Sequence, residues 1–235
     1  MTNHLEITKL PFLYLVAQPI FRVDEKNEKV IAYELLIRSR KDDSFPAELF
    51  EKIVLDQELN RQLLSWYSIE VLKIVSKTEE KININIHPQQ LYYPETFDML
   101  NKLAKYRTQI CVEITEHDTQ PSIKDNSKSF LLEVIKNIKR LGFLVALDDV
   151  NTGIHTFDNI VFFLADIDLL KFSIIPFKDK PCDVFLIINF WNCIAKEKKI
   201  TLLVEGIEDY KTKNQLIECG IFFQQGFQLG EPKLL

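Results

Sequence analysis

The chain alternates between short apolar segments and longer segments of helical periodicity. From about residue 80 onward, β-branched runs typical of buried strands are each followed by a stretch in which apolar residues return every three or four positions. The strand candidates are 12–22, 29–38, 81–87, 110–116, 144–149, 168–173, 200–206 and 222–227, and the helix candidates are 46–76, 94–105, 126–141, 182–198 and 209–219. This alternation predicts repeated βα units and a largely parallel sheet.

The first two strand candidates are arranged differently from the rest. Only the polar stretch VDEKNE separates them, which is short enough for a hairpin and therefore predicts an antiparallel pair. No GxGxxG turn follows the first strand, so an open doubly wound sheet is disfavoured. We predict an α/β fold, a TIM-like (β/α)8 barrel with one antiparallel strand near the N-terminus, formed by residues 1–235 as a single domain.

Polar side chains interrupt the apolar strands in a repeated way. Glu34, Glu113 and Glu205 each follow an aliphatic or aromatic residue inside a strand candidate, and Asn85 and Lys171 do the same. Because side chains alternate along a strand, these groups face the barrel interior if their neighbours face the helices. A single acidic residue at a strand end is usually solvated, but the repetition over successive strands favours convergence on one site.

Converging carboxylates need cations, because an uncompensated buried carboxylate is costly. The candidate ligands all offer oxygen atoms: Glu34, Asn85, Glu113, Asp148, Asp149 and Glu205. Oxygen ligands favour Mg²⁺ or Mn²⁺ over zinc or copper, and their number favours two ions, the arrangement that clamps a phosphodiester for in-line attack. Lys171 then either holds a water and stabilises charge on phosphate oxygens, or serves as an ordinary salt-bridge partner of the cluster.

Composition and charge narrow the possible partners. A net charge of −5 and a pI near 5.5 argue against binding of DNA or RNA polymers.

The four cysteines form no CxxC pair, which predicts reduced and mostly buried thiols. No secretory signal is visible at the start, and the apolar run 184–195 is shorter than the roughly 20 residues of a membrane span. We therefore expect a cytoplasmic protein without a membrane segment, in which this run is a core helix.

A series of short motifs resembles the EAL-domain cyclic di-GMP phosphodiesterases, over about residues 16–232. The motifs are AQPIF (17–21), YELLIR (33–38), NIHP (85–88), EITE (113–116), DDVNTG (148–153), LLK (169–171), VEGIE (204–208) and QQGF (224–227). Each is weak alone, but their order and spacing are specific. The resemblance implies a barrel with two Mg²⁺ or Mn²⁺ ions, hydrolysis of cyclic di-GMP to linear pGpG, and a homodimer formed near the loop after the fifth strand.

The resemblance also implies roles for individual residues. Glu205 and Lys171 match the catalytic pair, with Glu205 near the catalytic water and on metal. The metal ligands are again Glu34, Asn85, Glu113, Asp148, Asp149 and Glu205. Arg38 and Gln225 match residues that contact the substrate. Glu116 and Glu208 match residues that brace the loop after the fifth strand.

The chain departs from the family pattern at several positions. Leu35 replaces an alanine, His87 a serine, and Val150-Asn151 a Phe-Gly pair, while Ser173 stands where an aspartate is usual. Asparagine is the mildest replacement for a glycine of positive φ. A degenerate domain that binds cyclic di-GMP or a protein partner without turnover is the alternative, and retention of all six candidate ligands favours catalysis.

The remaining expectations concern histidines and one loop. We expect His117 and His155, with His4, to be surface or loop residues, and His87 to pack under the site. The polar stretch 117–128 is expected to form a surface loop.

Overall fold

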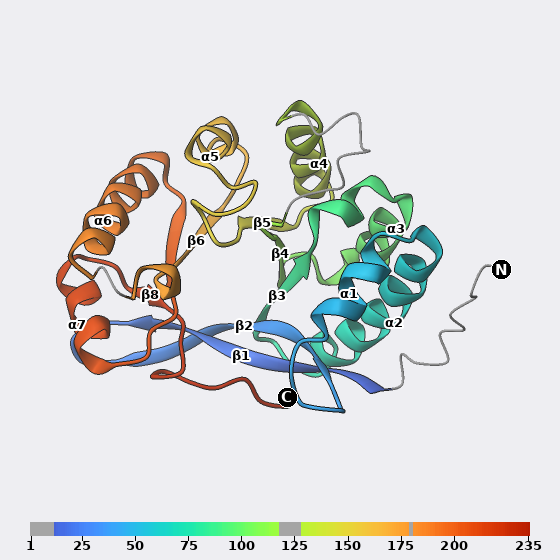
Figure 1. Cartoon of the computed structure of the whole chain (residues 1–235), viewed down its shortest axis with the longest axis horizontal. Helices are drawn as coiled ribbons and strands as arrows, with labels where there is room; N and C mark the ends of the chain where they lie inside the picture. Colours follow the sequence, from blue (N-terminus) through green and yellow to red (C-terminus); the bar gives the residue numbers. More distant parts are fainter. Residues whose placement is uncertain (1–11, 118–127, 179–180) are drawn as a thin grey trace.

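The computed structural model describes residues 12–117, 128–178 and 181–235, and these form a closed barrel whose strands follow one another in chain order (Figure 1). The strands are β1 (Leu13–Val23), β2 (Glu28–Ser39), β3 (Lys81–Ile86), β4 (Ile110–Ile114), β5 (Leu144–Leu147), β6 (Leu169–Ser173), β7 (Thr201–Glu205) and β8 (Phe223–Gln224). β1 runs antiparallel to both β2 and β8, and all other neighbours are parallel. The predicted barrel with one antiparallel strand is confirmed.

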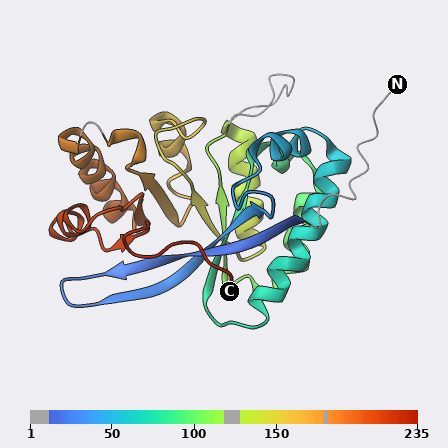
Figure 2. The same cartoon turned by 60° about the horizontal axis from the view of Figure 1, so that its bottom comes forward.

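β1 and β2 form a long hairpin along one side of the barrel, as Figure 2 shows. At its tip, Asp24 Oδ1 accepts hydrogen bonds from the backbone N–H groups of Lys26 and Asn27, both at 2.9 Å. An aspartate that bonds to the backbone two or three residues on favours a tight turn. The hairpin predicted from the short polar stretch is confirmed.

Helices and short 3₁₀ turns cover the outside of the barrel. They are α1 (Ala47–Val54), α2 (Gln57–Val75), η2 (Pro88–Tyr92), α3 (Pro94–Leu103), η3 (Ala104–Tyr106), α4 (Lys128–Arg140), α5 (Phe157–Phe163), η4 (Ile175–Phe177), α6 (Pro181–Lys198) and α7 (Tyr210–Glu218). The single helix predicted for 46–76 was wrong, because Asp56 is extended and its carboxylate caps α2 by accepting from the N–H of Leu59 at 2.9 Å. Sequence periodicity also missed α5, which has only seven residues.

Alternation along the strands separates two layers of side chains. In β3, Ile82, Ile84 and Ile86 are fully buried in the main core cluster, which includes residues of α2 and α3. The intervening residues of each strand point into the barrel, where Ala32 and Leu203, with Ile20, form a separate buried cluster. Two residues further along their strands, toward the carboxyl ends of β2 and β7, the interior side chains become acidic.

The helix α6 has one buried and one exposed face. Ile188 and Trp191 are buried, whereas Leu186 and Phe190 are exposed, so only one side of the predicted core helix belongs to the core. Within the described part of the chain, no helix has both the length and the apolar composition that a bilayer span requires.

The thiols that the structure describes are free but differ in exposure. Cys111 is buried, Cys219 half-buried and Cys193 exposed. The expectation of mostly buried thiols therefore fails at Cys193, which lies on the exposed face of α6. Most of the loop predicted for 117–128 lies outside the described residues, and His117 at its start is exposed.

Candidate active site

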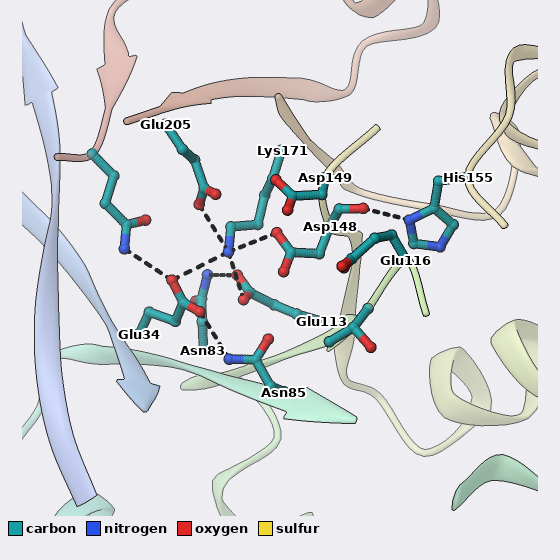
Figure 3. A network of polar contacts seen from close by, with 12 residues as sticks. Glu34, Asn83, Asn85, Glu113, Glu116, Asp148, Asp149, His155, Lys171 and Glu205 are labelled. Carbon is teal, nitrogen blue, oxygen red and sulfur yellow. Dashed lines mark hydrogen bonds and ion pairs between the residues drawn. The ribbon is translucent and has the colours of Figure 1, made fainter. Parts of the chain in front are cut away.

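Charged side chains from several strands meet at the carboxyl end of the barrel (Figure 3). Glu34 comes from β2, Glu113 from β4 and Lys171 from β6, while Glu205 is the last residue of β7. β5 ends at Leu147, earlier than predicted, so the two aspartates 148 and 149 begin the loop that follows it. Strand register thus gathers residues far apart in the sequence at one place, as in other parallel barrels.

Lys171 lies at the centre of this cluster and is 1% exposed. Its Nζ is 2.8 Å from Glu113 Oε2, 2.9 Å from Glu205 Oε1, 3.1 Å from Asp148 Oδ1 and 3.2 Å from Glu34 Oε2. An ammonium has only three N–H donors and one positive charge. With Asp149 alongside, five carboxylates surround one cation, so four negative charges remain uncompensated when all are ionised.

Three amide side chains donate hydrogen bonds to the carboxylates and thereby orient them. Asn83 Nδ2 donates to Glu113 Oε1 at 2.6 Å. Asn85 Nδ2 and Gln225 Nε2 donate to the two oxygens of Glu34, each at 2.8 Å. Because the amide nitrogens are used in this way, the amide oxygens of Asn85 and Gln225 are left to face other partners.

Four buried oxygen atoms of the cluster accept no hydrogen bond from any residue within 12–117, 128–178 and 181–235. They are Asn85 Oδ1, Gln225 Oε1, Asp148 Oδ1 and Glu205 Oε1, the last two of which lie only within ion-pair distance of Lys171. Buried acceptors without donors are rare, and cations satisfy them. Carboxylate oxygens within 4.8 Å of one another form two groups, Glu34–Glu113–Asp148 and Asp148–Asp149–Glu205. The donor set therefore fits hard divalent cations, and Asp148 is shared by both groups.

Burial and mutual repulsion alter the ionisation of the cluster. Burial raises the pKa of Glu113 and that of Glu205, against the opposing effect of Lys171. Burial and the charge of Asp148 raise the pKa of Asp149 to about 7. Burial also acts on Glu34, but the Lys171 charge and hydrogen bonds from the two amides lower its pKa. Glu113, Asp149 and Glu205 therefore retain protons more readily than ordinary carboxyl groups unless further positive charge is supplied.

The loop after β5 has an unusual backbone. Asp149 (φ 44°), Asn151 (φ 73°) and Gly153 (φ 46°) are all left-handed. A side chain at Gly153 is excluded, since its Cβ would lie 1.8 Å from the carbonyl oxygen of Glu116. That same carbonyl accepts a hydrogen bond from the N–H of Ile154 at 2.8 Å. The positive φ expected at Asn151 is confirmed, and the backbone of Glu116 contacts the loop.

Two of the predicted site residues lie at the margin. The side chain of Glu208 is exposed and pairs with Lys178 after β6 at 2.7 Å, rather than with the loop after β5. Arg38 is half-buried, and its guanidinium donates to the carbonyl of Ile37 at 2.9 Å. Arg38 lines the same cavity as Glu34 and the two aspartates after β5.

That cavity has a volume of about 770 Å³ and runs from the carboxylates toward α1 and α2. Its distal wall is aromatic: the rings of Phe45 and Phe50 lie 5.1 Å apart, and those of His87 and His117 also lie 5.1 Å apart. His87 therefore lines the cavity, and its Nδ1 accepts from the N–H of Gln89 at 3.0 Å. One end of the cavity is suited to cations and phosphate, and the other to flat rings.

Sequence reasoning missed three residues of the site. Asn83 lies two residues before Asn85 in β3, so both side chains point to the same side of the strand. The alternation in KININI therefore already predicted that Asn83 faces the barrel interior. Tyr67 of α2 is buried beside Glu34 and Glu113, and no local pattern marks it. His155, expected at the surface, is fully buried with Nδ1 bonded to the carbonyl of Asp148 (Figure 3), so that expectation was wrong.

Comparison with known proteins agrees with this geometry. The EAL domain family matches residues 9–232, nearly the whole chain. The chain belongs to the EAL domain family. The family resemblance noted in the sequence is therefore confirmed.

Curated relatives in this family include named phosphodiesterases. Cyclic di-GMP phosphodiesterase PdeF of Escherichia coli (strain K12) is 23% identical over 238 residues, which cover 94% of this chain and 30% of that protein. Cyclic di-GMP phosphodiesterase PdeA of Borreliella burgdorferi is 29% identical over 193 residues, covering 79% of this chain and 28% of that protein. The EAL chain described here spans less than a third of either relative.

Solved structures of EAL proteins show the same fold. The YkuI protein of Bacillus subtilis, solved with cyclic di-GMP and calcium, has a TM-score of 0.81 at 20% identity and covers 97% of this chain and 57% of its own. BlrP1 of Klebsiella pneumoniae, solved with manganese and cyclic di-GMP, has a TM-score of 0.76 at 21% identity and covers 94% of this chain and 56% of its own. At such identities the likeness concerns the fold.

The raised carboxyl pKa values predict how the stability of the metal-free protein depends on pH. Folded Glu113 (pKa about 8) and Asp149 (pKa about 7) keep protons that the unfolded chain releases near its ordinary values of 4.5 and 3.8. Between the unfolded and the folded pKa of each group, the folded state binds more protons than the unfolded state. The free energy of unfolding therefore falls as the pH rises from the unfolded pKa to the folded pKa. Above about pH 7.5 the two buried histidines are neutral in both states, because the ordinary pKa of 6.5 holds in the unfolded chain, and in the folded chain burial lowers the pKa of His87 to about 4 and lowers that of His155.

We expect the free energy of unfolding in EDTA to decrease from about pH 7.5 to about pH 8.5, with a shallower slope in Glu113→Gln. Denaturant titration at a series of pH values measures it, and Glu80→Gln, at an exposed position, is the control that should keep the wild-type slope. Saturating Mn²⁺ should abolish the decrease, since ions bind the ionised carboxylates. Stability that rises with pH in this window, or an unchanged slope in Glu113→Gln, would contradict the ionisation described here.

Proposed function

We propose that this EAL domain hydrolyses cyclic di-GMP to linear pGpG with two Mg²⁺ or Mn²⁺ ions. The observation that carries the proposal is the cluster of five carboxylates around Lys171, with its two oxygen groups joined at Asp148. Its excess of four negative charges equals the charge of two divalent cations. The names of the family's curated relatives and the cyclic di-GMP in related structures supply the substrate.

The two groups of oxygens divide the metal ligands between them. Glu34, Glu113 and Asp148, with Asn85, would hold one ion, and Asp148, Asp149 and Glu205 the other. When bound, the ions would polarise the phosphodiester and lower the pKa of an attacking water. Asp148 would then be the ligand common to both ions.

Lys171 and Glu205 act on that water. Their contact at 2.9 Å places an ammonium donor and a carboxylate acceptor at one point of the site. The carboxylate of Glu205 would take a proton from the water while Lys171 donates to the water oxygen or to the phosphate. The water oxygen then bonds to phosphorus as the bond from phosphorus to a ribose oxygen breaks, and that oxygen takes up a proton from solvent to become a hydroxyl.

Substrate recognition uses the cavity and its rim. Arg38 at the rim can donate to a phosphate oxygen, and Gln225, held to Glu34, presents its free carbonyl oxygen to the site. The aromatic wall of Phe50, His87 and His117 offers flat surfaces on which a guanine base can stack. The cavity thus accommodates both parts of a cyclic dinucleotide.

Turnover of cyclic di-GMP is the direct test of this proposal. We expect the purified protein to yield pGpG with Mn²⁺ or Mg²⁺ and none with EDTA, as resolved by chromatography. Glu205→Gln should lower kcat by about a hundredfold or more, because it removes the proton acceptor, while binding of cyclic di-GMP in Ca²⁺ is retained. Glu80→Gln, at an exposed position just before β3, is the matched control and should match wild type.

The outcomes separate the two functional readings. Binding of cyclic di-GMP without pGpG under either metal would replace the hydrolase by a non-catalytic binding domain, in which Ser173, paired with Glu205 in the strand register, lacks the usual carboxylate. Absence of both binding and turnover would refute the proposal.

An exposed apolar surface also supports the homodimer. Five exposed side chains form what we call the α5–α6 face: Phe157, Val161, Phe162, Leu186 and Phe190. The rings of Phe157 and Phe190 are 5.7 Å apart, and the two helices lie side by side in Figure 1. Apolar surface of this kind marks interfaces, and α5 directly follows the loop after β5, where the family resemblance places the dimer contact. We propose that a second copy of the chain covers this face.

Leu186→Glu should convert the dimer to a monomer, because a two-fold interface would bury this charge twice. Light scattering coupled to size-exclusion chromatography measures the mass. Ile69→Glu places the same charge at an exposed aliphatic position on α2 and should leave the dimer intact. A monomeric wild-type protein, or a dimer that survives Leu186→Glu, would exclude this face as the interface.

A further inference from the structure

The loop after β5 carries two of the carboxylates on a backbone that few residues adopt. Asp149, Asn151 and Gly153 alternate in the left-handed region, so the chain turns tightly between the end of β5 and the start of α5. Such conformations persist only where surrounding contacts hold them. The contacts that hold this loop therefore determine where the carboxylates of Asp148 and Asp149 point.

His155 closes this loop with three hydrogen bonds. Its N–H donates to the carbonyl of Thr152 at 2.8 Å, and its carbonyl accepts from the N–H of Asn151 at 2.8 Å. Its imidazole Nδ1 bonds to the carbonyl oxygen of Asp148 (Figure 3). A carbonyl can only accept, so Nδ1 carries a proton and acts as the donor.

The peptide that His155 holds is the one that joins Asp148 to Asp149. The preceding peptide, which joins Leu147 to Asp148, is held separately, because the N–H of Asp148 donates to the carbonyl of Ile114 in β4 at 3.0 Å. The direction of each Cα–Cβ bond depends on the two peptide planes that flank the residue, and the Asp148–Asp149 peptide is the plane that both residues share. The hydrogen bond from His155 thus constrains the relative orientation of two carboxylates, of which that of Asp148 belongs to both oxygen groups and that of Asp149 to one of them.

The other ring nitrogen shows that packing alone does not account for this residue. The side chain is fully buried, and Nε2 has no hydrogen-bond partner among the residues that the structure describes. An unpaired buried polar atom is unfavourable, and an apolar side chain would avoid it. A local penalty of this kind is expected where a residue serves the site rather than stability.

We propose that His155 is a positioning residue, which fixes the Asp148–Asp149 peptide through its Nδ1–H and so enables the site to hold two divalent cations at once. The inference rests on the proposed metal-dependent function and assigns a role to a residue outside the ligand set. His155 contacts neither ion nor substrate in this role, and acts only through the backbone of Asp148.

Three substitutions separate the hydrogen bond from the bulk of the side chain. His155→Asn keeps an N–H at the same distance along the side chain as Nδ1, His155→Gln moves the donor one bond further, and His155→Leu removes it. Asn159→Ala is the matched control, because Asn159 Nδ2 holds the same loop through the carbonyl of Ile154 at 2.6 Å without touching the Asp148–Asp149 peptide.

Calorimetric titration with Mn²⁺ and the electron paramagnetic resonance signal of a coupled Mn²⁺ pair are the readouts that do not depend on turnover. We expect two ions and a coupled signal in the wild type, His155→Asn and Asn159→Ala. His155→Gln and His155→Leu should bind the second ion at least about tenfold more weakly and lose the coupled signal. Their kcat should fall by a similar factor, with KM for cyclic di-GMP within about twofold of wild type.

The results distinguish failure of this inference from failure of the proposed function. Suppose that the wild type binds two ions and hydrolyses cyclic di-GMP. The positioning role is then refuted, and the proposed function stands, if His155→Leu binds both ions equally well or if Asn159→Ala weakens binding of the second ion as much as His155→Leu does. If wild type binds no Mn²⁺, both are refuted. Circular dichroism checks folding, and if His155→Leu does not fold, the difference between His155→Asn and His155→Gln decides.

Discussion

The structure of this domain depends on one buried ammonium among many carboxylates. Lys171 lies within 3.2 Å of four acidic side chains that come from β2, β4, β7 and the end of β5. Buried charges are stable only when they are paired, and one lysine cannot pair five carboxylates. The closed barrel brings these charges together, and their excess creates the demand for divalent cations. Fold and chemistry thus share one electrostatic constraint, to which the amides of Asn83, Asn85 and Gln225 add orientation.

The loop after β5 connects this electrostatic centre to the surface. It begins with the two aspartates, has a left-handed backbone at Asp149, Asn151 and Gly153, and leads into α5, part of the α5–α6 face. The buried side chain of His155 fastens its start, and the carbonyl of Glu116 contacts its middle. Because only this short loop separates α5 from the two aspartates, a movement of α5 at an interface would shift the positions of their carboxylates. In this respect the proposed dimer and the proposed metal site are parts of one arrangement.

Much of this site could be predicted because strand parity is a strong and local signal. A polar residue between aliphatic neighbours identified Glu34, Asn85, Glu113, Lys171 and Glu205, and the same signal extends to Asn83. Other features depend on contacts that no local pattern contains. His155 and Tyr67 are buried by segments that are distant in the sequence. Asp56 ends the helical periodicity of 46–76 because its carboxylate caps the start of α2. Glu208 pairs with Lys178, which lies in a different loop. The order of the motifs predicted the family, whereas side-chain partners in the loops required the structure.

The number and position of bound ions test the central claim most directly. Anomalous diffraction from crystals grown with Mn²⁺, recorded on both sides of the manganese absorption edge, locates the ions independently of any assay. We predict two peaks, one among Glu34, Asn85, Glu113 and Asp148 and one among Asp148, Asp149 and Glu205, with Lys171 Nζ withdrawn from at least one of its present carboxylate partners. No peak at saturating Mn²⁺, with Lys171 still in contact with all four carboxylates, would contradict the account.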